Sequence, residues 1–409
     1  MGTRTFLIRQ SFVPLMRLGA ILLLTGGLLP SLRGEDRVLD AAIPLQKPRK
    51  EPPRQGGPLD KVELRIWLPD NVPTLRGAIV NPFNTKAVEQ KHWQEAVRLW
   101  DFAMIGANYF GVGAGDYATL KEALKDFARQ SGHKEIEHLP LCFVGMSAGA
   151  GMSMKFAEAM PERTLAVAPV CLEVGPTSEA TRKIPVLTIF GEKDGKQMQL
   201  LTDKLPLQRQ DGARWAIAVQ WGRGHEFAAA NNLILPFFDQ VIRKRYPRDQ
   251  TPEKGPPKLL DYPEADGWLG EQDTWTTRRP AIHPAADFKG DRSKVCWLPN
   301  RQVACVWRAF VAKAPTLTIK APAGLGDGQP FAPHSAGEPL VVSVEDRGGK
   351  PRKVELFDGD TLLGECASMP FEFKVAKLQP GVHSLIAVAT YEKDEQSVSR
   401  PCTILVKAK

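Results

Sequence analysis

The chain has 409 residues, of which 43% are hydrophobic and 24% are charged, and its formal net charge is +8. This length allows two or more domains with buried cores, and the composition is that of a globular protein and not of a disordered one. Residues 1–34 contain four arginines and no acid, so the rest of the chain has a net charge of +4. A charge this small and this evenly scattered argues against nucleic-acid binding.

The first 34 residues have the three parts of an export signal. A basic stretch, MGTRTFLIRQSFVPLMR, precedes an apolar core, LGAILLLTGGLL, and a proline and the small residue Gly34 then precede an acidic start. A membrane span needs about 20 apolar residues, so this core is too short to cross a bilayer comfortably. We therefore predict a signal peptide over 1–34, a secreted or periplasmic protein, and no membrane span in the mature chain. An uncleaved signal anchor is the alternative.

Between residues 61 and 245 the sequence alternates between strand and helix patterns. It follows a predicted linker over 35–60 that is rich in proline and basic residues. KVELRIWLP alternates as a half-buried strand does, and AVEQKHWQEAVRLWDF has the apolar spacing of a helix. Further strands are predicted at 140–144, 165–170, 185–190 and 213–219, and further helices at 150–159 and 227–243. This alternation indicates an α/β fold with a doubly wound, mostly parallel sheet.

The rest of the chain has a different pattern. Residues 246–312 are rich in proline and charge, which predicts a linker or an extension that wraps the first domain; its tryptophans favour wrapping. Trp297 and Trp307 are expected in a strand pair. Residues 313–409 contain short strands separated by Gly, Pro and Asp turns, which predicts an all-β sandwich.

The six cysteines fit an oxidising compartment without fixing any disulfide. Cys296 and Cys305 flank a plausible bridged hairpin, and Cys366 and Cys402 could staple the C-terminal region. Since six cysteines allow about 15 connectivities, the pairing stays open. Cys171 lies in an apolar run and is expected to be a buried thiol or part of a local bridge. No cysteine or histidine cluster has metal-ligand spacing, so no metal site and no cofactor is expected.

One stretch, LCFVGMSAGAGMSMKF, places Gly145, Ser147 and Gly149 in the pattern Gly-x-Ser-x-Gly between a strand and a helix. The glycines permit a tight, strained turn that lifts the serine hydroxyl above the carboxyl edge of the sheet. The N-terminus of the following helix favours negative charge there. Ser153 is the competing serine, but it lies inside the helix. We therefore predict that Ser147 is a nucleophile.

A serine hydroxyl needs a base to take its proton, and the base needs an acid to orient it. In this layout the acid follows the serine and the histidine comes last. Asp194 lies in the loop after the strand IPVLTIFG, and Glu192 is the second choice of acid. His225 lies in a glycine loop after the strand RWAIAVQ, whereas the other six histidines precede the serine or fall in later segments. The predicted triad is Ser147, Asp194 and His225.

The predicted oxyanion hole uses two backbone N–H groups. One belongs to Ala148, directly after the serine. The other is expected from the loop NPFNT, which follows the second strand. Pro82 has no N–H to donate, which leaves Phe83 or Asn84 as the donor. Phe83 could also form part of the pocket wall.

Residues 61–243 resemble the α/β-hydrolase fold. The segments GMSAG, GEKD and GHEF are similar to those of secreted bacterial esterases of the polyhydroxybutyrate depolymerase, feruloyl esterase and acetylxylan esterase group. The resemblance implies that Ser147 is the nucleophile, that His225 is the general base and then the general acid, and that Asp194 orients it.

The chain departs from these esterases at one motif and resembles a second kind of module in its C-terminal part. Those esterases usually carry a His-Gly pair where this chain has Asn81 and Pro82, which affects the second oxyanion donor. Residues 340–406 resemble bacterial immunoglobulin-like modules appended to secreted enzymes. We expect this module to act as a spacer, with glycan or cell-surface contact as its other possible roles.

The expected function is an exported serine hydrolase, a carboxylesterase that acts through an acyl-enzyme on a small-molecule or polysaccharide ester. Two alternatives remain. One is a prolyl-oligopeptidase-like peptidase, although the chain lacks the long propeller that restricts access in such enzymes. The other is a catalytically silent binding or scaffolding protein at the cell surface, which the missing His-Gly pair would favour.

Overall fold

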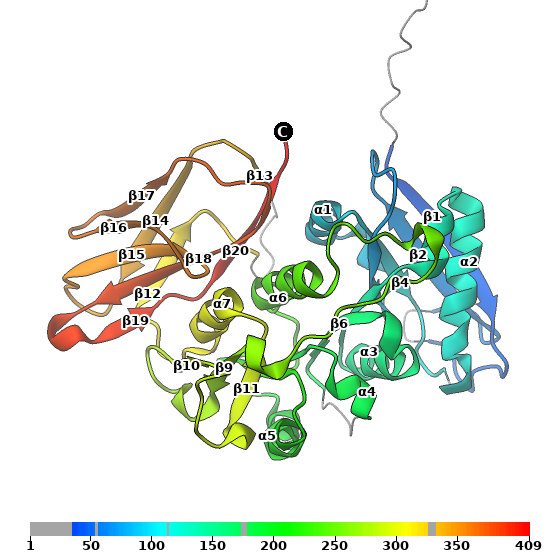
Figure 1. Ribbon diagram of the computed structural model, residues 1–409, viewed down its shortest axis with the longest axis horizontal. Coiled ribbons are helices and arrows are strands. Elements are labelled where there is room, and N and C mark those ends of the chain that lie inside the picture. Colours follow the sequence, from blue (N-terminus) through cyan, green and yellow to red (C-terminus); the bar gives the residue numbers. More distant parts are fainter. Residues whose placement is uncertain (1–34, 54–55, 113, 173–177, 326–332) are drawn as a thin grey trace, which may run out of the picture. The chain divides into compact units, whose positions relative to one another are not determined.

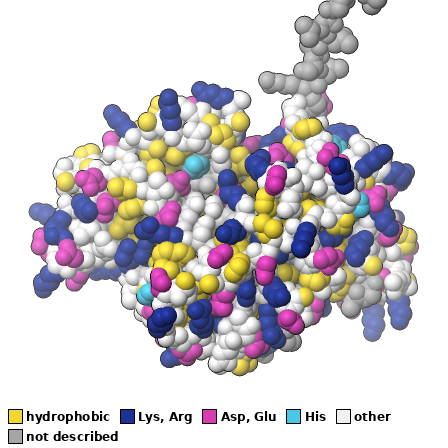
Figure 2. Space-filling view, viewed as in Figure 1, with side chains coloured by type: hydrophobic (Ala, Val, Ile, Leu, Met, Phe, Trp, Pro, Cys, Tyr) yellow, Lys and Arg dark blue, Asp and Glu magenta, His cyan; other side chains and the backbone are white. Residues whose placement is uncertain are grey.

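The computed structural model describes residues 35–409 except 54–55, 113, 173–177 and 326–332 (Figure 1). The predicted signal peptide, 1–34, lies outside the described residues. Among the helices that are described, none is long and apolar enough to cross a membrane. Basic and acidic side chains are interspersed over the face seen in Figure 2, which is the scatter of charge expected from the sequence.

The largest sheet has the strand order β1-β2-β4-β3-β5-β6-β7-β8. Its strands are β1 (Arg37–Pro44), β2 (Lys61–Leu68), β3 (Gly77–Asn81), β4 (Phe102–Ala107), β5 (Leu141–Met146), β6 (Thr164–Val170), β7 (Val186–Gly191) and β8 (Trp215–Gln220). Strands β3 to β8 run parallel, and β2 is antiparallel to both of its neighbours. The predicted mostly parallel sheet is therefore present.

The prediction of a linker over 35–60 is wrong for its first part, where strand β1 lies. Its eight residues pair along their whole length with β2 and add an edge strand to the sheet. Its core-facing side chains, Leu39, Ala41 and Ile43, alternate along the strand, but the outward positions include the apolar Val38 and Ala42, so the alternation of apolar and polar residues is weak.

Helices connect these strands: α1 (Lys91–Trp100), α2 (Thr119–Ser131), α3 (Ala148–Ala159), α4 (Glu179–Arg182), α5 (Gly195–Gln210) and α6 (Asn231–Arg245). Helix α1 buries Trp93, Val97 and Trp100, the apolar face expected from their spacing. Strands β4, β6, β7 and β8 are buried at every residue. Parallel strands of this kind have both faces covered, and the polar loops at the strand ends are left to build a site.

Residues 246–312 have more regular structure than predicted. They form a small sheet in the order β10-β9-β11, from β9 (Trp268–Glu271), β10 (Ile282–Pro284) and β11 (Val295–Leu298), followed by helix α7 (Arg301–Val311). The predicted strand pair is wrong, because Trp307 lies on α7, where its indole N–H donates to the Ile217 carbonyl of β8 over 2.7 Å. Helix α7 also contacts α6. Helix α7 and Trp275 of this segment thus belong to the hydrophobic core around the large sheet, whereas Trp297 belongs to a small separate cluster.

The prediction of a disulfide-bridged hairpin at Cys296 and Cys305 is also wrong. All six cysteines lie in the described part of the chain, and all six are free thiols. Cys296 is on strand β11 and Cys305 is on helix α7, so no hairpin joins them. Cys366 and Cys402 are unpaired as well.

The C-terminal part forms two sheets around one core. The first has the order β12-β14-β17, from β12 (Leu317–Ala321), β14 (Leu340–Asp346) and β17 (Phe371–Val375). The second has the order β13-β20-β18-β15-β16, with β19 paired to β18, from β13 (His334–Ser335), β15 (Lys353–Asp358), β16 (Thr361–Cys366), β18 (Gly381–Thr390), β19 (Gln396–Val398) and β20 (Cys402–Lys407). Apolar side chains from both sheets share one cluster, as in a sandwich.

The buried side chain and backbone of Asn232 on helix α6 form hydrogen bonds with this β part. The Asn232 side-chain oxygen accepts the backbone N–H of Thr403 over 2.9 Å, and the Thr403 hydroxyl donates to the Asn232 carbonyl over 2.9 Å. The Asn232 amide group also donates to the Leu325 carbonyl. Since a buried polar group is costly unless it is paired, these bonds fix the β part against α6.

Candidate active site

Ser147 sits on a strained turn between strand β5 and helix α3. Its φ and ψ are 54° and −125°, a conformation that side chains other than glycine rarely adopt. The Ser147 N–H donates to the Val170 carbonyl at the end of β6 over 2.8 Å. A Cβ at Gly145 would lie 2.4 Å from the Gly149 carbonyl oxygen, and one at Gly149 would lie 2.7 Å from Cβ of Phe83. The two glycines of the motif are therefore needed for close packing around the serine.

Asp194 and His225 meet at the neighbouring strand ends. The Nδ1 atom of His225 lies 3.0 and 3.1 Å from the two carboxylate oxygens of Asp194. The carboxylate is nearly buried, with 10% of its side chain exposed, whereas the His225 side chain is 42% exposed. The carboxylate can thus hold the imidazole with its Nδ1 protonated while the other ring nitrogen remains available.

Gly191 explains how the histidine loop comes close to the end of β7. A Cβ at this glycine would lie 2.2 Å from the Gly224 carbonyl oxygen, so a larger residue would push the loop away. The backbone N–H of Lys193 also donates to the Arg223 carbonyl over 2.8 Å. These contacts place His225 beside Asp194.

Glu192, the second choice of acid, has other partners. Its carboxylate accepts the Gly222 N–H over 2.9 Å and forms an ion pair of 3.2 Å with Lys313. The Gly222 hydrogen bond, followed by the Lys313 ammonium, lowers the pKa of Glu192. Glu192 thus holds the start of the loop that carries His225, at Gly222, and Asp194 is the acid that contacts His225.

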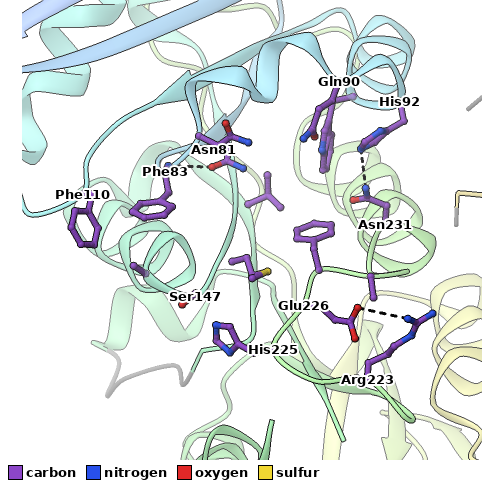
Figure 3. A pocket seen from close by; sticks show the side chains of 17 residues that line it. Asn81, Phe83, Gln90, His92, Phe110, Ser147, Arg223, His225, Glu226 and Asn231 are labelled. Atoms are coloured by element: carbon purple, nitrogen blue, oxygen red, sulfur yellow. Dashed lines mark hydrogen bonds and ion pairs between the residues drawn. The ribbon is translucent and has the colours of Figure 1, made fainter. Parts of the chain in front are cut away.

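Ser147 and His225 line the same cavity, which has a volume of about 770 Å³ (Figure 3). Among the described residues, neither the Ser147 hydroxyl nor the Nε2 atom of His225 makes a hydrogen bond within 3.5 Å. In enzymes without substrate such bonds are often long and tighten only in the complex. The structure places the serine, the histidine and the acid at one edge of the sheet, and the serine and the histidine line the cavity.

The two predicted oxyanion donors, the N–H groups of Ala148 and Phe83, differ in their surroundings. Ala148 is the first residue of α3 and lines the cavity beside Ser147. The N–H of Phe83 is instead donated to the side-chain oxygen of Asn81 over 3.1 Å (Figure 3). This is the local turn that asparagine forms with the backbone two residues on. An oxyanion could use the Phe83 N–H only after displacing the Asn81 side chain; Asn84, the other candidate, also lines the cavity.

The opposite wall of the cavity contains residues that the sequence analysis did not select. His92 on α1 and Asn231 on α6 are joined by a hydrogen bond of 2.9 Å between Nε2 and Nδ2 (Figure 3). Burial lowers the pKa of His92 to about 4, so its ring is neutral near pH 7. Gln90 is also part of this wall, and Arg223 pairs with Glu226 at 3.7 Å nearer to His225. These residues come from distant parts of the chain, and no local motif marks them.

The low pKa of His92 predicts an acid-dependent loss of stability. Below pH 6.5 the unfolded chain binds a proton at this ring, and the folded protein does not do so until about pH 4. The free energy of unfolding should therefore fall by about 3 kcal/mol from this group between pH 7 and pH 4. Urea unfolding at the two pH values checks this in the natural protein and in His92→Gln, which cannot titrate. The variant should lose about 3 kcal/mol less; equal losses would show that folded His92 takes up the proton.

No family model and no curated protein matches the chain. Among solved structures, a cold-adapted esterase from an Arctic intertidal metagenomic library matches with a TM-score of 0.35 and 14% identity, over 51% of this chain and 96% of the other. The feruloyl esterase module from Clostridium thermocellum matches with a TM-score of 0.32 and 11% identity, over 46% and 82%. Fibronectin(III)-like modules of Clostridium thermocellum CbhA match with a TM-score of 0.20 and 26% identity, over 22% and 94%. At these TM-scores neither fold nor function is inferred from the likeness, and both depend on the geometry of this chain.

Proposed function

We propose that the chain is an exported serine hydrolase of the α/β-hydrolase fold, a carboxylesterase that acts through an acyl-enzyme. One observation carries this proposal. A serine on a strained strand–turn–helix and an imidazole held by a nearly buried carboxylate line the same cavity. Asp194 and His225 are in contact and Ser147 lines the same cavity as His225. All three follow strand ends in the chain order of a serine hydrolase, which supports the proposal.

In the proposed reaction the Ser147 hydroxyl attacks the ester carbonyl while Nε2 of His225 takes its proton. Asp194 keeps Nδ1 protonated and stabilises the imidazolium. The tetrahedral oxyanion accepts the Ala148 N–H and, once the Asn81 side chain has rotated away, the Phe83 N–H. The imidazolium then protonates the departing alcohol and leaves an acyl-serine. Water, deprotonated by His225, attacks the acyl-serine, which releases the acid and restores the serine.

The cavity lining supports an uncharged ester as the substrate. Aromatic side chains and neutral amides make up about half of its lining residues, and His92 is neutral near pH 7. Its charged side chains, Arg223 and Glu226, pair with each other. A polysaccharide ester fits this mixture of apolar surface and neutral hydrogen-bonding groups.

A second candidate has one specific observation in its favour. The bond between the Phe83 N–H and Asn81 occupies a predicted oxyanion donor, as expected of a catalytically silent binding protein.

In either case we infer that residues 1–34 are a signal peptide. We also infer that residues 313–409 form an immunoglobulin-like module that acts as a spacer.

A fluorophosphonate probe separates the two candidates, because it reacts only with an activated serine hydroxyl. We expect stoichiometric labelling of the natural protein, with the added mass on the peptide that contains Ser147, and none in Ser147→Ala. Turnover of p-nitrophenyl acetate but not of a peptide amide would complete the case for an esterase. An unlabelled Ser147 in folded protein would support the silent binding protein, and cleavage of the amide would favour a peptidase.

A further inference from the structure

Cys171 is a buried thiol next to the proposed triad that the reaction does not use. It follows strand β6 directly, its backbone has a φ of 54°, and its side chain is fully buried. The Cys171 N–H donates to the Ile189 carbonyl of β7 over 2.8 Å, and its sulfur lies 3.3 Å from the Glu226 carbonyl oxygen. The thiol therefore lies between the end of β6 and the loop that carries His225.

The sulfur of Cys171, a carboxylate oxygen of Asp194 and a ring nitrogen of His225 all lie within 4.8 Å of one another. These atoms are a soft thiol, a hard carboxylate and an imidazole, the three ligand types that Zn²⁺ accepts in proteins. They come from the ends of β6, β7 and β8, and the segments that carry them are joined by backbone hydrogen bonds. The positions of the three donors are thus set by the sheet.

We propose that Cys171, Asp194 and His225 form an inhibitory binding site for a thiophilic divalent cation, Zn²⁺ in the first place. Zinc bonds to sulfur, nitrogen and oxygen are about 2.0 to 2.3 Å long, so tetrahedral ligands lie roughly 3.3 to 3.8 Å apart. The three donors lie within 4.8 Å of one another, so they need to approach by roughly 1.5 Å at most to reach that separation. Binding releases the thiol proton to solvent and leaves a thiolate on the metal; a water molecule or the Glu226 carbonyl oxygen can be the fourth ligand.

Binding at this site conflicts with the proposed catalysis. The Nδ1 atom of His225 faces Asp194, and a cation between them replaces their hydrogen bond. An imidazole coordinated through Nδ1 has its remaining proton on Nε2, so Nε2 cannot accept the proton of Ser147. Hard cations such as Mg²⁺ prefer oxygen ligands in an octahedral arrangement and should have no effect.

The test measures zinc binding and inhibition separately. Zinc binding to the full chain is measured by competition with a fluorescent zinc indicator, and the rate with p-nitrophenyl acetate is measured with and without Zn²⁺. The decisive variant is Cys171→Ser, which keeps the size and the hydrogen-bond donor but loses the soft ligand. Cys366→Ser, at a partly exposed thiol on strand β16, is the matched control.

We expect the natural protein and Cys366→Ser to bind one Zn²⁺ at micromolar concentration or below and to lose activity reversibly, with recovery on adding a chelator. Cys171→Ser should bind Zn²⁺ about tenfold or more weakly, and the ratio of its rates with and without Zn²⁺ should be closer to one. Equal affinity in Cys171→Ser, or binding without inhibition of an active enzyme, would overturn the proposal. The inhibitory role depends on the proposed hydrolase activity, whereas binding does not: a protein that binds zinc through Cys171 but cleaves no ester would contradict only the function.

Discussion

Replacing Ser147 by alanine is expected to lower kcat for p-nitrophenyl acetate by about 10⁴-fold or more. The variant loses the nucleophile, so no acyl-enzyme forms, and only binding and the oxyanion donors remain to assist direct attack by water. Alanine is smaller than serine and leaves the turn between β5 and α3 in place. The free energy of unfolding should therefore change little, which circular dichroism and urea unfolding can check beside the kinetics.

Ser153 offers a matched control for this experiment. It lies on helix α3, less than two turns after Ser147, is fully buried, and donates its hydroxyl to the Gly149 carbonyl over 2.8 Å. Ser153→Ala therefore removes a hydroxyl close to the site without removing the proposed nucleophile. Its kcat should stay within a few-fold of the natural value. A folded Ser147→Ala that retained a tenth of the natural rate would rule out Ser147 as the nucleophile.

The strands of the large sheet that were predicted well share one physical cause. Strands β4 to β8 are buried on both faces, so each is a continuous apolar run whose length and flanking turns identify it. Helix α7 was missed because its sequence, RQVACVWRAFV, contains several residues that favour strands, although Val303, Val306 and Phe310 recur at helical spacing. Its helical state is stabilised by packing on β8 and α6, which local sequence does not show.

Some residues of the candidate site could likewise be predicted from the sequence, and others could not. Ser147, Asp194 and His225 each follow a strand, and the carboxyl ends of parallel strands share one edge, so their placement at the same edge of the sheet could be expected from the sequence. The pair of His92 and Asn231 joins helices 139 residues apart, and nothing local marks it. The hydrogen bond from Phe83 to Asn81 did have a local signal, because an asparagine often accepts the N–H two residues later.

Replacing Asp194 by asparagine is expected to lower kcat by about 10³- to 10⁴-fold while leaving the shape of the site unchanged. The carboxylate oxygens now accept the proton of His225 Nδ1 at 3.0 and 3.1 Å. An asparagine amide can donate to Nδ1 instead, which places the imidazole proton on Nε2. The ring then has no lone pair facing Ser147 and cannot act as its base. The loss should appear in kcat more than in KM, because the Asp194 side chain does not line the cavity.

Glu192→Gln is the matched control, since Glu192 lies two residues earlier in the same loop. Its carboxylate contacts Gly222 and Lys313 and not His225, so the glutamine variant should retain kcat within a few-fold. If Glu192→Gln were the inactive variant and Asp194→Asn retained full activity, the acid would be misassigned. If both variants were fully active, the hydrogen bond between Asp194 and His225 would be structural, and the proposed mechanism would lose its base. The two variants therefore test whether the carboxylate nearest to the imidazole controls the position of its proton.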